Sequence, residues 1–576
     1  LDHDLTVEEI FDTLIKNYEV DENLSKYEAR GIFGLYNQLK KQGYLAYQPI
    51  NIAYGIKETT VAKIEEGLME FSGIDVSIEP VRYYPEGTTA AHILGYLGKI
   101  SQPNEIQKYI GEKNYSPGTI IGKTGIEESF EDQLSGEHGI KRIEVDSVGN
   151  TTSVISEIKP VPGDNLYLSI DLDLQKKAEE VLEHSLTEIQ KGGTYKSPWG
   201  DYKYSINRSK RRPYKYATSG AVVAVDVKTG QVLASASFPA YDPNLFATGI
   251  TDSDWLSLFP ENEDDLLAPR PLYNIATQTA LEPGSIFKMA TALTALEKGL
   301  SPDKKIRDMG YVNVGKQMNC LLWTMSRRTH GNVNVYEALR DSCNYYFYSL
   351  ALGQNQRTGE SIGTKIEIED IVDMVRKLGM DDKTGIEINI PAERSGGAPE
   401  PYRKIQRDKS MLRNHLKLII DDAFKEDFEY DEDYKTEVIE EILSWMELEE
   451  ELSRGEVIRR LESLGIDAEK KLPSEGRGLA DIIKFDYLRF AGWNMLETLN
   501  VTIGQGMGSY TPIQMANYIA TIANGGNRHK LTLIDNIKNY NNSETVHKHE
   551  PQAEKIQLND YDNLEHIKKG MLMVTK

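Results

Sequence analysis

The sequence predicts an α+β protein with at least two domains, on the strength of three observations. The 576 residues exceed the length that one hydrophobic core usually organises. A turn-rich stretch at residues 160–164, with Pro160, Pro162 and Gly163, interrupts the chain after a segment of mixed patterns. Two β-rich runs and a series of helical patterns follow, which is the order of a sheet covered by helices. We therefore expect a mixed domain over residues 1–160 and an α/β domain over residues 161–576.

The elements of these domains can be predicted in chain order. An amphipathic helix is expected over residues 6–17 of the first domain. The second domain opens with a strand over 166–170 and a helix over 174–190. Two strands, 221–227 and 232–237, should form a hairpin around Lys228-Thr229-Gly230. Further helices are expected over residues 287–298, 336–340, 345–352, 368–378 and 512–524.

A strongly charged, largely acidic region at residues 404–481 interrupts the second domain. Apolar residues recur at helical spacing over 438–452 and again over 457–464. Over the whole region Asp and Glu outnumber Lys and Arg. The pattern predicts an inserted helical hairpin.

Composition and charge exclude several functional classes. Hydrophobic residues make up 39% of the chain and charged residues 27%, which is the composition of a globular protein. The formal net charge of -23 repels phosphate backbones, so we expect no nucleic-acid partner. The sequence has neither an apolar run of about 18 residues nor a recognisable signal peptide, so no segment of it is predicted to span a membrane.

The strongest candidate for catalysis is Ser285, which stands where an apolar helix begins. The turn Pro283-Gly284 precedes it, and Lys288 follows at a spacing that places both side chains on one helical face. A serine hydroxyl becomes a good nucleophile only when a neighbouring base takes its proton. A lysine can be that base if burial and a helix N-terminus lower its pKa. The alternative is an ordinary helix, capped by Ser285, with Lys288 on its surface.

A second element, Ser342-Cys343-Asn344, lies between two predicted helices. If this connection is extended, Ser342 and Asn344 point the same way, and a hydroxyl and an amide face one cleft. Alone, the spacing of the two residues carries little information. Its value lies in its position after the Ser285 element.

The two cysteines of the chain fall in one window with an acid and an imidazole. Asp308, Cys320, His330 and Cys343 are residue types that suit a tetrahedral zinc site, although their spacing is not that of a zinc finger. Two alternatives stay open: a disulfide between Cys320 and Cys343, and two free packed thiols. Another carboxylate could also take the place of Asp308.

Several motifs together resemble one protein family. S-x-x-K, S-D-N and K-T-G form the motif set of β-lactamases and penicillin-binding proteins, and Ser285 with Lys288 and Ser342 with Asn344 match the first two in order. Other matching stretches are Gly220-Ala221-Val222-Val223-Ala224-Val225-Asp226, Tyr241-Asp242-Pro243-Asn244, Arg270-Pro271-Leu272-Tyr273-Asn274 and Gly504-Gln505-Gly506. The chain thus resembles class B penicillin-binding proteins almost throughout. Its first domain, with Gly122-Lys123-Thr124-Gly125-Ile126-Glu127, is similar to the pedestal domain of the elongation subclass.

The resemblance implies a serine D,D-transpeptidase that cross-links peptidoglycan stem peptides through an acyl-enzyme on Ser285. Lys288 would take the proton of Ser285, Ser342 would relay a proton to the leaving amine, and Asn344 would hold the stem peptide. β-Lactams are then expected to bind covalently. Expected partners are membrane proteins of the elongation complex, such as a cognate glycosyltransferase. The expected location is the extracytoplasmic face of the cell membrane, with an N-terminal anchor outside this chain. The rival functions are a non-catalytic scaffold of cell-wall assembly and a serine β-lactamase-like hydrolase.

The resemblance also bears on the metal and on the third motif. Some elongation-type relatives carry a metal beside the active serine, which implies a structural zinc at the Cys320 window that would brace Ser342 and Asn344. No other cofactor is expected. The family's K-T-G follows the Gly-Gln-Gly region, and no such triplet occurs from Gly526 to Lys576. Lys123-Thr124-Gly125 and Lys383-Thr384-Gly385 are expected to be unrelated to it because of their positions. We therefore expect the C-terminal end of the catalytic domain to be missing.

Overall fold

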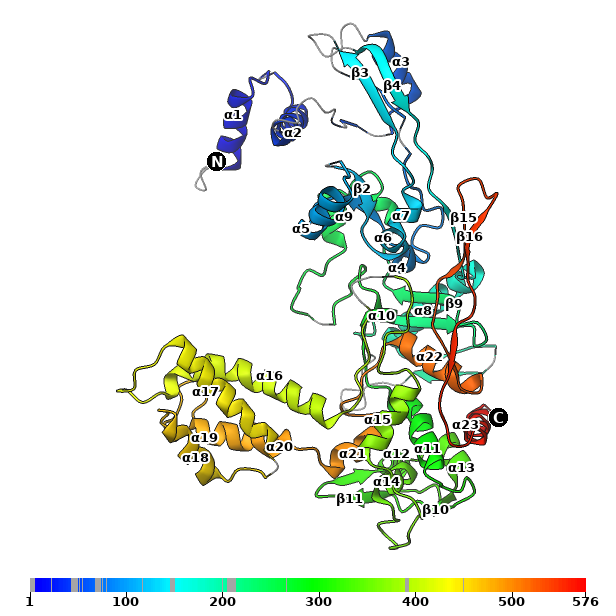
Figure 1. Cartoon of the computed structure of the whole chain (residues 1–576), viewed down its shortest axis with the longest axis vertical. Helices are drawn as coiled ribbons and strands as arrows, with labels where there is room; N and C mark the ends of the chain where they lie inside the picture. Colours follow the sequence, from blue (N-terminus) through cyan, green and yellow to red (C-terminus); the bar gives the residue numbers. More distant parts are fainter. Residues whose placement is uncertain are drawn as a thin grey trace. The chain divides into compact units, whose positions relative to one another are not determined.

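The computed structural model divides the chain into two compact units, Leu1–Val81 with His138–Pro160 and Arg82–Glu137 with Val161–Lys576. Figure 1 shows their helices and strands with the labels used below. None of the helices that the structure describes combines the length and the apolar character needed to cross a bilayer. The structure describes residues 6–575 apart from 22, 43–49, 51, 54, 68–73, 75, 79, 117, 146–150, 199, 205–213, 266, 389–392 and 449.

The first unit is small and mostly helical. It contains α1 (Val7–Asn17), α2 (Lys26–Gln42), α3 (Glu58–Glu66) and an antiparallel ribbon of β3 (Ile140–Val145) and β4 (Thr151–Ile158). Helix α1 starts where the sequence predicts because Thr6 and Glu9 form a capping box. Its small core includes the buried side chains of Val20, Ala29 and Phe33.

Residues 82–137 pack with the second unit, although the sequence analysis assigns them to the first domain. They form α4 (Ala91–Leu94), β1 (Leu97–Lys99), α5 (Pro103–Glu105), η2 (Ile106–Glu112), β2 (Ile120–Gly122), α6 (Gly125–Ser129) and α7 (Glu131–Leu134). Ile93 and Ile126 share one hydrophobic cluster with Val232 and Leu533. The domain boundary near residue 160 stays a prediction, since packing and sequence order divide the chain differently.

The predicted hairpin is confirmed in the second unit. Strand β8 (Gly220–Val225) pairs antiparallel with β9 (Val232–Phe238), with Val222 opposite Ala236. Helix α8 (Leu172–Lys191) covers β9 through Leu182 and Leu186. A three-stranded sheet stands beside them, in which β15 (Ile534–Lys538) lies between β16 (Thr545–Lys548) and β5 (Asn165–Leu168). The pairs β6 (Gly193–Tyr195) with β7 (Tyr202–Tyr204) and β14 (Asn527–His529) with β17 (Ala553–Lys555) are separate ribbons.

The helices predicted to cover the sheet are all present, with small shifts at their ends. They are α11 (Lys288–Glu297), α13 (Val335–Arg340), α14 (Asn344–Leu352), α15 (Ile368–Lys377) and α22 (Pro512–Ala523). Around them lie α10 (Ile275–Gln278), α12 (Leu321–Ser326), α21 (Met495–Thr502) and α23 (Asp562–Val574), with the short ribbons β10 (Ile306–Arg307) with β13 (Asn332–Val333) and β11 (Tyr311–Asn313) with β12 (Gln317–Asn319). The largest core of the described residues lies among these helices and includes Leu293, Tyr346 and Val375. Helix α9 (Asp252–Ser257) lies apart from this core, where its Trp255 packs against Phe246. The fold is α+β, as predicted.

The acidic insertion is a helical subdomain, so the prediction of a hairpin is wrong. It comprises α16 (Pro401–Ile419), α17 (Glu432–Ser444), α18 (Arg454–Ser463), α19 (Leu479–Ile482), η7 (Ile483–Leu488) and α20 (Arg489–Ala491). These helices surround a core of their own that includes Leu416, Ile442 and Leu461. Two helices cannot bury apolar faces of this size against each other alone, and α16 and α19 supply the rest of the cover.

One buried lysine ties the two ends of this subdomain together. Lys404, on the first turns of α16, is 3% exposed. Its ammonium group donates to the carbonyl oxygens of Phe490 and Gly492 and forms an ion pair of 2.7 Å with Glu497 of α21. A buried charge is tolerated only when such partners replace water. Lys404 therefore fixes both the entry and the exit of the insertion at the rest of the second unit.

Replacing Lys404 by Ala should loosen this junction without melting the subdomain. We expect faster amide hydrogen exchange in residues 489–497, because Glu497 and two carbonyl groups lose their partner. Exchange within Arg454–Ser463 should stay at the wild-type rate, since α18 packs in the separate core. Lys417→Ala, at an exposed position of the same helix, is the control. Equal exchange in wild type and Lys404→Ala would contradict the role of the junction.

Candidate active site

Ser285 lies in a single 3-10 turn, η4 (Gly284–Phe287), that leads into α11. The prediction that Ser285 caps the helix is therefore wrong: α11 begins three residues later, at Lys288. A 3-10 turn has three residues per turn, so Ser285 and Lys288 still lie on one side. The turn is held from outside, since Gly284 donates to the carbonyl oxygen of Gly504 over 2.8 Å. Gly504 must be glycine, because a Cβ there would stand 2.0 Å from the oxygen of Gly284.

Lys288 is 1% exposed. Its ammonium group donates hydrogen bonds to Ser342 and Asn344 of the second motif. Its Nζ donates to the carbonyl oxygen and to the Oγ of Ser342, each over 2.9 Å, and to Oδ1 of Asn344 over 2.6 Å. The ring of Phe347 lies 5.5 Å away. Burial lowers the pKa of Lys288 to about 8, against the smaller opposing effect of the Cys343 and Cys320 side chains. Of the two conditions predicted for a lysine base, burial is thus present.

Ser342 connects Lys288 to Ser285. Its hydroxyl donates to the hydroxyl of Ser285 over 2.9 Å and accepts from Lys288. Ser342 has a φ of 52°, in the left-handed region, and Asn344 is already the first residue of α14. The predicted extended connection is therefore wrong, because the chain turns sharply between α13 and α14. The left-handed turn aims both the hydroxyl and the carbonyl of Ser342 at the ammonium group, which an extended residue does not do.

All four residues predicted for this site are brought together, and one more was missed. Tyr518 of α22 is fully buried, donates to the carbonyl oxygen of Ile286 and accepts from the N–H of Ala290. It thereby anchors the backbone on both sides of Lys288. A tyrosine on the apolar face of a predicted helix is a weak signal for this role, because its hydroxyl must find some partner when buried.

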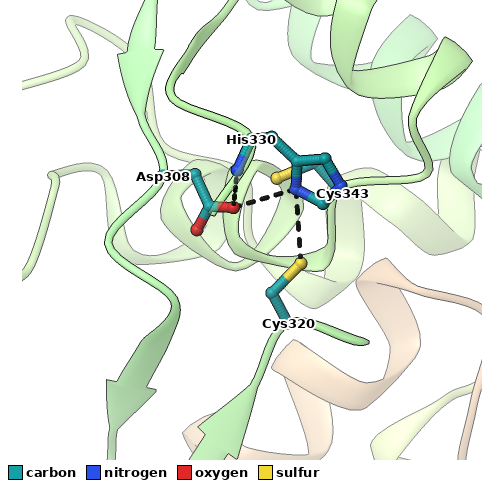
Figure 2. Close-up of side chains that lie close together, drawn as sticks. All are labelled: Asp308, Cys320, His330 and Cys343. Atoms are coloured by element: carbon teal, nitrogen blue, oxygen red, sulfur yellow. Dashed lines mark hydrogen bonds and ion pairs between the residues drawn. The ribbon is translucent and has the colours of Figure 1, made fainter. Parts of the chain in front are cut away.

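The four residues predicted to form a zinc site, Asp308, Cys320, His330 and Cys343, also lie close together. Their ligand atoms all lie within 4.8 Å of one another, and Figure 2 shows the side chains meeting from separate segments. His330 Nδ1 stands 2.9 Å from Oδ2 of Asp308 and 3.7 Å from Sγ of Cys320. Asp308 also accepts from the backbone N–H groups of Gly310 and His330, which fixes its orientation. Three of the four are almost fully buried.

The two thiols are free in the structure rather than joined in a disulfide. A hydrogen bond between them lowers the pKa of Cys320 to about 6 and raises the pKa of Cys343. One thiolate beside one thiol is the state of a pair that shares a proton. A thiolate, an imidazole and a carboxylate at this separation form a donor set of the kind that zinc takes.

None of the three K-T-G triplets of the chain has a described contact with Ser285. Lys228-Thr229-Gly230 lies in the turn between β8 and β9. Lys123-Thr124-Gly125 joins β2 to α6, where Lys123 forms an ion pair with Glu105. Lys383-Thr384-Gly385 follows α15, and Thr384 donates to the carboxylate of Glu393. The hydroxyl of Ser285 has its described contact with Ser342 instead.

Comparison with known protein families assigns both parts of the chain. The model of the penicillin-binding protein dimerisation domain matches residues 2–168, and the model of the penicillin-binding protein transpeptidase domain matches residues 220–412 and 460–576. The second match alone spans more than half of the chain and contains Ser285, Lys288, Ser342 and Asn344. Residues 413–459, within the helical insertion, are left out of it. Fold and site together define a penicillin-binding transpeptidase domain.

Curated relatives and solved structures agree with this assignment. The peptidoglycan D,D-transpeptidase MrdA of Acinetobacter baumannii is 32% identical over 363 residues, or 63% of this chain and 46% of the relative. MrdA of Escherichia coli is 29% identical and covers 63% of this chain and 49% of the relative. The chain thus spans about half the length of these relatives. A solved complex of the penicillin-binding protein PBP2 with MreC from Helicobacter pylori contains a chain of similar fold, with a TM-score of 0.58 and 21% sequence identity. The match covers 99% of this chain and 77% of that chain. The chain belongs to the penicillin-binding proteins that combine a dimerisation domain with a transpeptidase domain.

The left-handed backbone conformation of Ser342 should lower the free energy of unfolding of the protein. Ser342→Gly and Ser342→Ala both remove the hydroxyl, but only glycine adopts this conformation without strain. We expect the glycine variant to exceed the alanine variant in free energy of unfolding by about 1 kcal/mol, measured by urea denaturation. An alanine variant as stable as the glycine variant would show that the turn is not strained.

Proposed function

We propose that this chain carries the catalytic serine of a D,D-transpeptidase that cross-links peptidoglycan stem peptides during cell-wall elongation. The observation that carries the proposal is the hydrogen-bonded series Ser285, Ser342 and Lys288, with a buried lysine whose pKa is lowered to about 8. The proposal is supported by the relatives of the chain, which are named peptidoglycan D,D-transpeptidases. A base with a pKa near the working pH is the kind that general-base catalysis needs.

In the first step the hydroxyl of Ser285 attacks the carbonyl carbon between the two terminal D-alanines of a stem peptide. A bond forms between Oγ and that carbon, and the proton of Ser285 passes through Ser342 to neutral Lys288. The backbone N–H of Ser285 supplies one donor for the developing oxyanion. The bond to the last D-alanine then breaks, and its amine takes the proton back along the same series.

In the second step an amine from a neighbouring stem peptide attacks the acyl-enzyme. Lys288 and Ser342 accept the proton of this amine, a new amide bond forms, and the proton returns to Ser285 as its ester bond breaks. Asn344 holds the backbone of the stem peptide through its amide group, while its oxygen keeps Lys288 in place. A β-lactam contains a reactive amide that enters only the first step, so it should remain on Ser285.

Two similar solved structures support a proposal for the setting of this reaction. The solved Helicobacter pylori complex joins PBP2 to MreC, and a second similar structure is described as a peptidoglycan synthase complex that coordinates polymerisation and cross-linking. We propose that this protein likewise works on the extracytoplasmic face of the cell membrane. Its partners there would be membrane proteins of the elongation machinery, including a glycosyltransferase that makes the glycan strands.

Covalent labelling tests this function. We expect a fluorescent penicillin to label Ser285, as located by mass spectrometry of the digested protein, and Ser285→Ala to stay unlabelled. The experiment should use this chain and a version that includes any residues encoded after position 576. A long-lived label indicates a transpeptidase, whereas rapid release of hydrolysed penicillin indicates a β-lactamase-like hydrolase. An extended protein that takes no label would favour the scaffold function and overturn the proposal.

We also propose that Asp308, Cys320, His330 and Cys343 hold a structural zinc ion. A tetrahedron with zinc bonds of about 2.0–2.3 Å has edges of roughly 3.3–3.8 Å, so donor atoms within 4.8 Å need to move only slightly. The ion would supply a fixed cross-link, since four protein donors fill a tetrahedral site. Cys343 lies between Ser342 and Asn344, so its fixation would hold the left-handed turn and the start of α14 in place.

Metal analysis tests the zinc site. Protein purified without chelator should contain zinc in equimolar amount, and Cys320→Ser and Cys343→Ser should each lose most of it. His547→Ala removes an exposed imidazole from β16, outside the cluster, and should keep the metal. Stripping the metal should lower the melting temperature, because the ion binds only the folded state. Metal-free protein with two titratable thiols, or with a Cys320 to Cys343 disulfide, would contradict the zinc proposal.

A further inference from the structure

An open cavity of about 530 Å³ lies in the catalytic unit, away from the residues of the Ser285 site. Its walls are the loop 379–385 after α15, Asn517 of α22 and the ribbon of β14 with β17. A volume of this size is typical of sites for small molecules. None of its lining residues has a role in the proposed acyl transfer.

Three basic side chains line this cavity, and one of them is already neutralised. Arg528 forms an ion pair with Glu554 over 2.9 Å and approaches Asp382 at 3.5 Å. The ammonium groups of Lys383 and Lys530, by contrast, form neither a hydrogen bond nor an ion pair with any residue that the structure describes, although the backbone N–H of Lys530 donates to the carbonyl oxygen of Gln552. These two positive charges thus have no ion-pair partner among the described residues.

The carboxyl group of Glu393 interacts electrostatically with Lys383, but its hydrogen bonds are made elsewhere. It is buried at 6% exposure and accepts hydrogen bonds from the backbone N–H and the hydroxyl of Thr384. Burial raises the pKa of Glu393, and its carboxyl group is engaged by Thr384.

The fold holds the two lysines on the same wall. Leu531 donates to the carbonyl oxygen of Thr384 over 3.0 Å, which sets the two segments side by side. The stem of Lys530 lies across Gly385, where a Cβ would stand 2.6 Å from its Cγ. Gly385 has a φ of 87° and therefore accepts no side chain without strain. Two like charges kept together in a chain of net charge -23 form a local positive field that attracts anions.

We propose that this cavity binds the phosphate or diphosphate group of a phosphorylated saccharide. Lysine ammonium groups act as point charges and suit the rounded shape of a phosphate, whereas a carboxylate pairs best with the planar fork of an arginine. The only arginine in the lining, Arg528, is already occupied by Glu554. The volume exceeds that of a phosphate group, which leaves space for a sugar beside it.

Calorimetric titration with pyrophosphate and with glucose 1-phosphate tests the site on the intact chain. Lys383→Gln and Lys530→Gln should each weaken binding by about tenfold, the usual effect of losing one charge-assisted hydrogen bond. Lys548→Gln, which removes an exposed lysine from β16, should bind like wild type. Raising the salt concentration should weaken binding, because the lysines are exposed to solvent.

The outcomes separate the ligand chemistries. Pyrophosphate binding with tighter binding of glucose 1-phosphate supports the saccharide, and binding of pyrophosphate alone restricts the site to the free anion. Tighter binding of citrate than of either probe would replace the phosphate by a carboxylate and overturn the assignment. If a lysine variant fails to fold, nuclear magnetic resonance of reductively methylated wild-type protein is the second readout, with shifts expected at Lys383 and Lys530. No binding to wild type at millimolar concentration, or binding that neither substitution changes, refutes the inference.

Discussion

The burial of one ammonium group, that of Lys288, dictates the arrangement of the catalytic centre. A buried cation must exchange its water for other acceptors. Lys288 finds them in the carbonyl and hydroxyl oxygens of Ser342 and in the amide of Asn344. Three acceptors on two neighbouring residues can converge on one point only if the backbone turns sharply, and this explains the left-handed Ser342. The hydroxyl of Ser342 is then left to donate to Ser285, which couples the nucleophile to the lysine.

The parts of this centre that depend on local pattern could be predicted from the sequence. The spacing of Ser285 and Lys288 keeps the two residues on one side in a 3-10 turn as well as in an α-helix, so the pair survives the error about the helix start. The conformation of Ser342 could not be predicted, because a tertiary contact with Lys288 imposes it against the preference of the residue. Tyr518 was missed for a similar reason, since its hydrogen bonds reach residues that lie far away in the sequence.

Larger features show the same division between local and long-range information. The β8–β9 hairpin and the helices around it follow from periodicity and turn residues. The number of helices in the insertion does not, because its core also draws on α16 and α19, which lie outside the two clearest heptad-like stretches. The packing of residues 82–137 with the catalytic unit has no signature in composition. Lys383 and Lys530 likewise stand in unrelated stretches of sequence, and only the fold brings them to one cavity.

A direct measurement of the protonation of Lys288 tests the central claim that burial turns this lysine into a base. In protein with carbon-13 in its lysine side chains, Lys288 should titrate with a pKa near 8, well below the ordinary value of 10.5. The neutral amine is the reactive form, so the rate of acylation by a β-lactam should rise with pH, pass its midpoint at the same value and then level off. A lysine that titrates near its ordinary value, or an acylation rate that does not change between pH 6 and pH 9, would contradict the account.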